Sequence, residues 1–170
     1  MTPGSTGRAR VLTVSTSAAA GEAVDRSGPV LVEGLRALGL DTPDPVVVAD
    51  GDPVGAGLRA CLAEGVDVVL LSGGTGLTPD DTTPEQVAPL LDVLVPGIGE
   101  ALRSDGRARG VATAALSRGV AGVAGRTLVV ALPGSTGACR DALAVLGPLL
   151  PHAVAMLGGG VAHAHGRGEP

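Results

Sequence analysis

A glycine-rich loop and a small set of carboxylates are the residues of this sequence best suited to chemistry. Gly73-Gly74-Thr75-Gly76 carries no large side chain, so its amide N–H groups are able to converge on an anion such as phosphate, with the Thr75 hydroxyl as a further donor. Asp80 and Asp81 follow this loop, and Asp50 follows an earlier apolar run. Carboxylates repel a neighbouring phosphate unless a divalent cation lies between them, and Mg²⁺ is the usual choice. The combination favours a site for a metal and a nucleotide.

The same residues allow a simpler interpretation, in which Asp80 and Asp81 only solvate a turn before a helix. Two further features stand near apolar runs: the small-residue loop Pro133-Gly134-Ser135 and the polar pair Ser117-Arg118. That pair is either a helix terminus or a hydroxyl and a guanidinium offered to a phosphate. Lys is absent from the sequence, which excludes a Walker-type lysine, a Schiff base and a lysine nucleophile.

Apolar runs that alternate with amphipathic segments must position these residues. They predict strands at 10–15, 45–50, 66–72 and 127–132, and helices at 25–39, 52–65, 83–95 and 138–157, with one or two short helices between 97 and 118. A capping box at Thr83–Gln86 is expected to start the third helix, and Pro148 and Pro151 to break the last one. Near-continuous apolar strands indicate a mostly parallel sheet covered on both faces.

We therefore predict one α/β domain over residues 10–157, with a flexible segment at 1–9 and a disordered tail at 158–170. Ligands of open parallel sheets bind beyond the carboxyl ends of the strands. Asp50, the Gly73–Gly76 loop and Pro133–Ser135 each follow such an end, so we expect them to meet.

The composition excludes several classes of function. The net charge is −5 and the arginines are scattered, which argues against a nucleic-acid groove. No apolar run approaches the roughly 20 residues of a membrane span. Aromatic side chains are absent, so a ligand ring has none to stack on. Cys61 and Cys139 lack metal-ligand spacing, and we expect free thiols in a reducing cytoplasm.

Seven segments occur in the order seen in the MogA/MoaB-like molybdopterin-binding proteins of molybdenum cofactor biosynthesis. They are VLTVST, GEAVDRSGP, VVVAD, SGGTGLTPDDTTPE, VPGIGEALR, ALSRGVAG and ALPGSTGA, and the resemblance covers residues 10 to about 157. It implies a three-layer α/β/α sandwich with a mostly parallel central sheet. It also implies a homotrimer or hexamer, and a molybdenum insertion enzyme as a partner.

The activity that this resemblance implies is Mg²⁺- and ATP-dependent adenylylation of molybdopterin, which yields adenylyl-molybdopterin and pyrophosphate. The site residues carried over divide into four groups: Gly73, Gly74, Thr75 and Gly76 for nucleotide phosphates; Asp50 and Asp81 for catalysis and the metal; Ser117 near the pterin phosphate; and Pro133, Gly134 and Ser135 as the second substrate loop. Asp80 stands where family members often carry Arg.

Two other functions stay open. The chain resembles a molybdopterin carrier or scaffold if Asp80 abolishes turnover. The same type of domain occurs in competence-damage-inducible proteins with pyrophosphatase activity, although those are usually longer than 170 residues.

Overall fold

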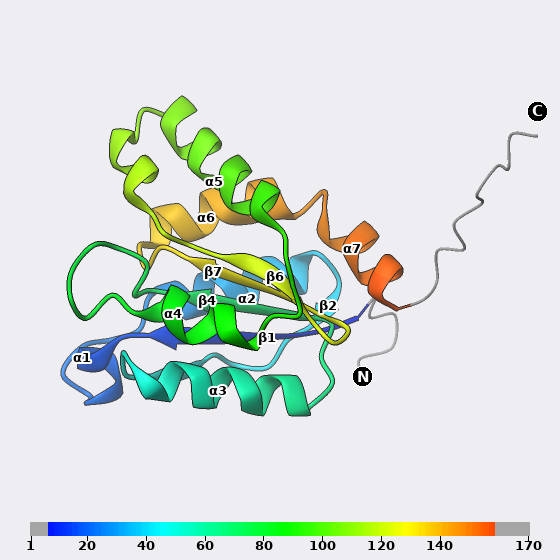
Figure 1. Ribbon diagram of the computed structural model, residues 1–170, viewed down its shortest axis with the longest axis horizontal. Helices are drawn as coiled ribbons and strands as arrows, with labels where there is room; N and C mark the ends of the chain where they lie inside the picture. Colours follow the sequence, from blue (N-terminus) through cyan, green and yellow to red (C-terminus); the bar gives the residue numbers. More distant parts are fainter. Residues whose placement is uncertain (1–6, 159–170) are drawn as a thin grey trace, which may run out of the picture.

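Neighbouring residues of the central strands point to opposite faces of the sheet, and both sets are buried. The computed structural model describes residues 7–158. In it Val11 and Leu70 lie in one apolar cluster, whereas their neighbours Leu12 and Leu71 lie in another on the opposite face. Such alternation requires helices on both sides of the sheet. The predicted three-layer α/β/α sandwich is confirmed (Figure 1).

The sheet has seven strands in the described part of the chain and is mostly parallel, as predicted. Its order is β2-β1-β4-β7-β6-β5, and β3 also pairs with β1. Pairing is parallel among the first strands, while β6 runs antiparallel to both β7 and β5. The strands are β1 (Gly7–Val14), β2 (Leu40–Asp41), β3 (Val46–Val48), β4 (Val68–Ser72), β5 (Val93–Leu94), β6 (Ala121–Ala124) and β7 (Thr127–Leu132).

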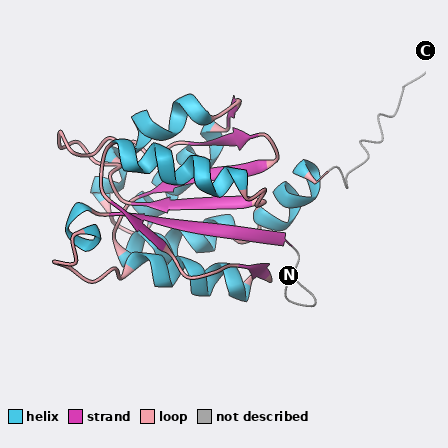
Figure 2. Ribbon diagram, turned by 90° about the horizontal axis from the view of Figure 1, so that it is seen from below, coloured by secondary structure: helices cyan, strands magenta, loops and turns pink. Residues whose placement is uncertain are grey.

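Helices cover the two faces unequally (Figure 2). One face packs against α2 (Ser27–Ala37), α5 (Pro96–Ala108), α6 (Thr136–Leu146) and α7 (Leu150–Leu157). The other face packs against α3 (Asp52–Ala63) and α4 (Thr83–Val87). Three short elements complete the described chain: α1 (Thr16–Ala19) and the 3₁₀ helices η1 (Ala88–Leu90) and η2 (Ala112–Leu116).

The helix predicted at 83–95 begins at Thr83 as expected, but it ends at Val87 because the chain then turns into the sheet. After α4 and η1, the N–H groups of Asp92 and Val95 donate to the carbonyls of Val123 and Ala121. This pairing adds β5 as an edge strand to β6, neither of which the sequence pattern revealed. The predicted capping box is also absent: Thr82 holds the N-cap position without a side-chain hydrogen bond, and the Gln86 amide donates to Asp52.

The chain ends differ from expectation in one respect. β1 begins at Gly7, so residues 7–9 belong to the sheet rather than to the predicted flexible segment. Residues 159–170 of the predicted tail lie outside the described residues. The expected break between α6 and α7 is present, with a bend of 63°. From residue 7 to residue 158, no single helix is long and apolar enough to cross a membrane; α6 and α7 would reach that length only as this bent pair.

Gly73 joins three strands at the carboxyl edge of the sheet, and its backbone requires glycine. Its φ is 113°, and a Cβ there would lie 2.2 Å from the carbonyl oxygen of Val14. We expect Gly73→Ala to lower the free energy of unfolding by about 3 kcal/mol or more, because a left-handed backbone is strained and the clash is with main chain. Urea unfolding measures this difference.

Gly65 provides the matched control, since its φ is 67° but no atom lies within 4 Å of a Cβ there. Gly65→Ala should cost only about 1 kcal/mol. Equal losses in the two variants would contradict the assigned role of Gly73.

Candidate functional site

The loops after β4 and β7 meet through main-chain atoms. The N–H of Gly73 donates to the carbonyl of Leu132 at 2.9 Å, and a Cβ on Gly134 would lie 3.2 Å from the Cα of Gly73. The predicted meeting of these two loops is therefore observed. Because the N–H of Gly73 donates to β7, only the remaining amides of the loop are able to donate hydrogen bonds to a bound anion.

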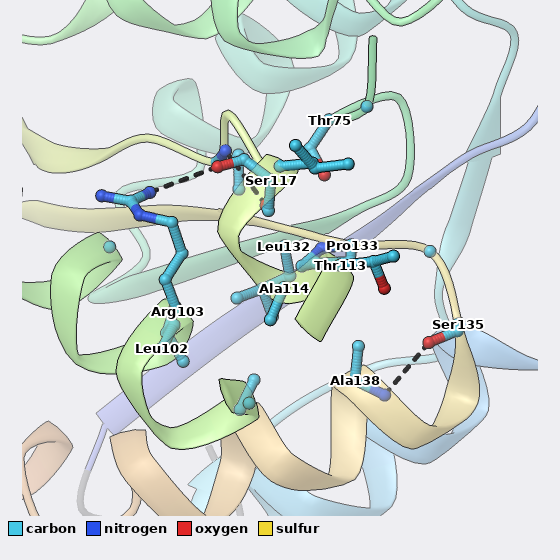
Figure 3. A pocket seen from close by; sticks show the side chains of 18 of the residues that line it. Thr75, Leu102, Arg103, Thr113, Ala114, Ser117, Leu132, Pro133, Ser135 and Ala138 are labelled. Carbon is cyan, nitrogen blue, oxygen red and sulfur yellow. Dashed lines mark hydrogen bonds between the residues drawn. The ribbon is translucent and has the colours of Figure 1, made fainter. Parts of the chain in front are cut away.

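A cavity of about 630 Å³ lies beside the two loops (Figure 3). Most of the sequence-predicted site residues line it: Gly74, Thr75, Gly76, Asp81, Ser117, Pro133, Gly134 and Ser135. Gly73 and Asp50 do not line it. Its opposite wall comes from α5 and η2, which pack together where Gly106 lies under Ala114.

Three carbonyl groups of the glycine loop accept hydrogen bonds, and two of its amides donate none. The carbonyls of Gly74 and Thr75 accept from the N–H groups of Thr83 and Arg118 at 3.0 and 2.9 Å, and that of Gly76 accepts from Arg118 Nε at 2.8 Å. Among the described residues, the N–H groups of Gly74 and Thr75 have no acceptor. Two unpaired amides beside a cavity are suited to bind a phosphate oxygen.

Arg118 holds the loop rather than offering its charge to the cavity. Its guanidinium donates to the carbonyls of Gly76 and Asp81 and to the carboxylate of Glu85. These three contacts join residues that lie 33 to 42 positions apart, and the main-chain N–H of Arg118 also donates to the carbonyl of Thr75. The pair follows the C-terminus of η2, where Ser117 is the C-cap, so the helix-terminus interpretation is correct; Arg118 in addition clamps the glycine loop. Ser117 does face the cavity, and its hydroxyl accepts from the N–H of Gly119 at 3.3 Å.

Asp81 closes the turn that follows the loop. Its Oδ2 accepts from the N–H of Thr78 at 2.9 Å and from the hydroxyl of Thr78 at 2.6 Å. The hydroxyl bond is the main reason why the pKa of Asp81 lies below its ordinary value, with the N–H groups of Thr78 and Gly76 and the charge of Arg118 acting in the same direction. Asp81 is therefore a carboxylate at neutral pH.

Asp50 lies at the other end of the loop. Its Oδ2 accepts from the N–H and the hydroxyl of Thr16 at 3.1 and 2.7 Å, and its own N–H donates back to that hydroxyl at 3.2 Å. Its Oδ1 lies 3.1 Å from the position that a Cβ on Gly74 would take. Asp50 thus borders Gly74, whereas Asp81 borders Gly76.

The sequence interpretation missed Arg103, the one cationic side chain in the lining of this cavity. It extends from α5, and its guanidinium donates to the carbonyl of Ser117 at 3.4 Å (Figure 3). A signal was present: Gly99, Arg103 and Gly106 have the spacing of one helical face, and both glycines are buried. An arginine on a buried face indicates a polar partner or a ligand.

The loop after β7 opens α6 at the cavity wall. Ser135 is the N-cap, and its hydroxyl accepts from the N–H of Ala138 at 3.1 Å. Gly137 and Ala138 also line the cavity. The amides of a helix N-terminus and its dipole favour anions, so this wall and the glycine loop both suit phosphate groups.

A resident metal would depend on few protein ligands. Within residues 7–158 there is no group of three or more His, Cys, Asp or Glu side chains that could hold one. Mg²⁺ is commonly held by one or two carboxylates, with water and substrate phosphates completing its shell. The carboxylates at the two ends of the loop fit that kind of site, and the cation predicted between Asp50 and Asp81 stays a prediction.

Comparison with known proteins identifies relatives of this chain. Residues 10–152 match the family described as "Probable molybdopterin binding domain". The molybdenum cofactor biosynthesis protein B of Escherichia coli K12 is 41% identical over 137 residues, which are 79% of each chain. A molybdenum cofactor biosynthesis bifunctional protein of Synechococcus elongatus is 45% identical over 152 residues, 89% of this chain and 47% of that protein. The chain therefore spans about half the length of such bifunctional relatives.

A crystal structure of a molybdopterin biosynthesis protein from Mycobacterium abscessus superposes with a TM-score of 0.86 at 42% identity. The match covers 91% of this chain and 98% of that one. The relatives and the fold agree with the resemblance stated from the seven sequence segments.

Removal of the Arg118 clamp should loosen the glycine loop. We expect Arg118→Gln to lower the free energy of unfolding by about 1–2 kcal/mol, because a partly exposed side chain loses its charged hydrogen bonds to two carbonyls and to the Glu85 carboxylate. The Thr83 N–H, which donates to Gly74, should exchange with deuterium faster, as NMR would measure.

Arg126→Gln is the matched control, since Arg126 Nε also donates to a carbonyl, that of Leu157 at 3.1 Å. It should leave the Thr83 exchange rate unchanged. Unchanged exchange in Arg118→Gln as well would show that the clamp does not order the loop.

Proposed function

The chain belongs to the MogA/MoaB-like family of molybdopterin-binding domains, a family of molybdenum cofactor biosynthesis, and from this membership we propose that it transfers an adenylyl group from ATP to molybdopterin. The observation that carries the proposal is the common cavity. One space is bordered by the amides of the glycine loop, by Asp81, by Ser117 and by the N-terminus of α6. Two anion-binding walls that face one cavity are what a reaction between two phosphate-bearing substrates requires.

In the proposed reaction, an oxygen of the terminal phosphate of molybdopterin attacks the α-phosphorus of ATP. The new bond is a P–O–P link, the bond to the β-phosphate breaks, and pyrophosphate leaves. The nucleophile is already an anion, so no general base is needed. Mg²⁺, when bound, would neutralise charge on the triphosphate. The protein's part is to hold two anions together, with the unpaired amides of Gly74 and Thr75 as donors for one of them.

Asp81 supports this proposal by its position. It lines the cavity, it is ionised, and it fixes the turn that ends the glycine loop. Asp80 is exposed and does not line the cavity. The place of the usual family arginine is thus taken by a side chain outside the space proposed for the reactants.

A pterin carrier is the second candidate, and the charges of the cavity favour it. The lining contains two carboxylates, Asp81 and Asp141, but only one guanidinium, that of Arg103. Such a balance binds a triphosphate weakly without added cations. Calorimetry that detects molybdopterin binding, but no consumption of ATP in the presence of Mg²⁺, would favour the carrier.

Pyrophosphate release tests the adenylyltransferase directly. Molybdopterin, ATP and Mg²⁺ together should yield pyrophosphate, and Asp81→Asn should lower kcat/KM by about a hundredfold, because the loop loses the anion that fixes its turn. A coupled phosphate assay measures both.

Asp80→Asn removes the same charge one position earlier and should stay within about twofold of wild type, since an exposed charge is screened by salt. If wild type and Asp81→Asn give the same background, the assignment of Asp81 is wrong.

We also propose that the chain assembles as a homotrimer. Val93 and Leu94 on the edge strand β5 are 59% and 58% exposed, and exposed apolar side chains on an edge strand suit a contact with another chain. Sedimentation at micromolar concentration should show a species of about three times 16.4 kDa. A lone 16.4 kDa species would contradict the trimer.

A further inference from the structure

Thr83 carries a buried hydroxyl that has no hydrogen-bond partner. The residue is 1% exposed, and among the described residues the side-chain oxygens of Thr83 and its neighbour Thr82 are buried without a partner. The hydroxyl does not cap α4, because no side-chain capping bond is present at its start. Unpaired buried polar groups are rare in folded proteins and call for a ligand or another specific reason.

The Thr83 hydroxyl faces the same small space as the carboxylate of Asp50. A Cβ on Gly74 would lie 2.3 Å from Thr83 Oγ1 and 3.1 Å from Asp50 Oδ1. Only the absence of a side chain at Gly74 keeps this space free. Two oxygens from segments far apart in the sequence, one neutral and one anionic, therefore border the same space beside Gly74.

The Asp50 carboxylate is oriented for this meeting. Thr16 binds Oδ2 through its N–H and its hydroxyl, at 3.1 and 2.7 Å. Within residues 7–158, Oδ1 accepts no hydrogen bond. A carboxylate held at one oxygen with the other oxygen unpaired is the arrangement that orients a metal ligand.

We propose that Thr83 Oγ1 and Asp50 Oδ1 are the protein ligands of the divalent cation that serves the nucleotide. Hard oxygen donors suit Mg²⁺, and phosphate-binding NTPases also combine a Ser or Thr hydroxyl with an Asp carboxylate. Gly74 borders both this space and the main cavity, so a cation here lies next to the place proposed for the triphosphate. The inference rests on the proposed function, because substrate phosphates complete the shell of the cation.

The proposal separates the two aspartates that the sequence pairs as metal ligands. Asp81 binds Thr78 through Oδ2 and lies beside Gly76, whereas Asp50 and the unpaired Thr83 hydroxyl lie beside Gly74. The task of Asp81 is to shape the loop. The cation belongs to Asp50 and Thr83.

Mn²⁺ binding to the protein alone, followed by electron paramagnetic resonance at millimolar protein, tests this assignment. Thr83→Val should weaken Mn²⁺ binding by about tenfold or more, and Asp50→Asn should abolish it, whereas Thr83→Ser should retain it. Asp81→Asn should bind Mn²⁺ within about twofold of wild type, since it is not a ligand. Thr82→Val is the matched control: its hydroxyl is equally unpaired, but no atom of Thr82 is among the three nearest to the Cβ position of Gly74.

Thermal unfolding keeps the test independent of misfolding. Thr83→Val has the shape of threonine and removes only an unpaired hydroxyl, so its Tm without metal should equal or exceed that of wild type. The rise in Tm that Mn²⁺ produces in wild type should be lost.

Three results overturn the assignment: no Mn²⁺ binding by wild type, unchanged binding in Thr83→Val, or a loss in Asp81→Asn as large as that in Asp50→Asn. The pyrophosphate assay is a separate readout. If Mn²⁺ binding follows the expected pattern while no pyrophosphate is released, the cation site stands and the adenylyltransferase fails.

Discussion

Main-chain contact between the loops after β4 and β7 fixes the candidate site. A Cβ on Gly73 would clash with the carbonyl oxygen of Val14 on one side, and a Cβ on Gly134 would lie 3.2 Å from the Cα of Gly73 on the other. The strands behind these loops are fully buried, so the contact is set by the sheet and does not depend on flexible side chains. The parallel strands therefore fix the position of both walls proposed to bind phosphate, as expected of ligand sites at the carboxyl edge of such a sheet.

Charge within the site is used mainly to organise the protein. The Arg118 guanidinium donates to the carbonyls of Gly76 and Asp81 and to the Glu85 carboxylate, and one oxygen of Asp81 accepts from Thr78. The cavity itself keeps little positive charge, in a chain whose net charge is −5. Under the proposed function, neutral amide donors and a cation from solution have to balance the anionic substrates, so the location of that cation decides the electrostatics of the site.

Local patterns were sufficient for most of the sheet and for the loops, but not for contacts between distant segments. The parallel strands and the glycine loop follow from apolar runs and from glycine at strand ends, both of which are visible along the sequence. Strand β5 exists only because it pairs with β6, and a two-residue edge strand has no pattern of its own. The role of Arg118 depends on partners more than 30 residues away. Thr83 was predicted to be a helix cap because the residues next to it in the sequence do not reveal that its hydroxyl lies beside Gly74.

The close packing of η2 against α5 in the cavity wall depends on the absence of a Cβ at Gly106. A Cβ on Gly106 would lie 2.7 Å from the Cβ of Ala114, so any larger residue at 106 has to push η2 outward. Both residues line the cavity, in the wall opposite the loops after β4 and β7. One methyl group at residue 106 would thus change the width of the cavity without moving the glycine loop and its charged neighbours. Substitution at residue 106 is therefore a simple way for related proteins to change the width of ligand ring that the cavity accepts.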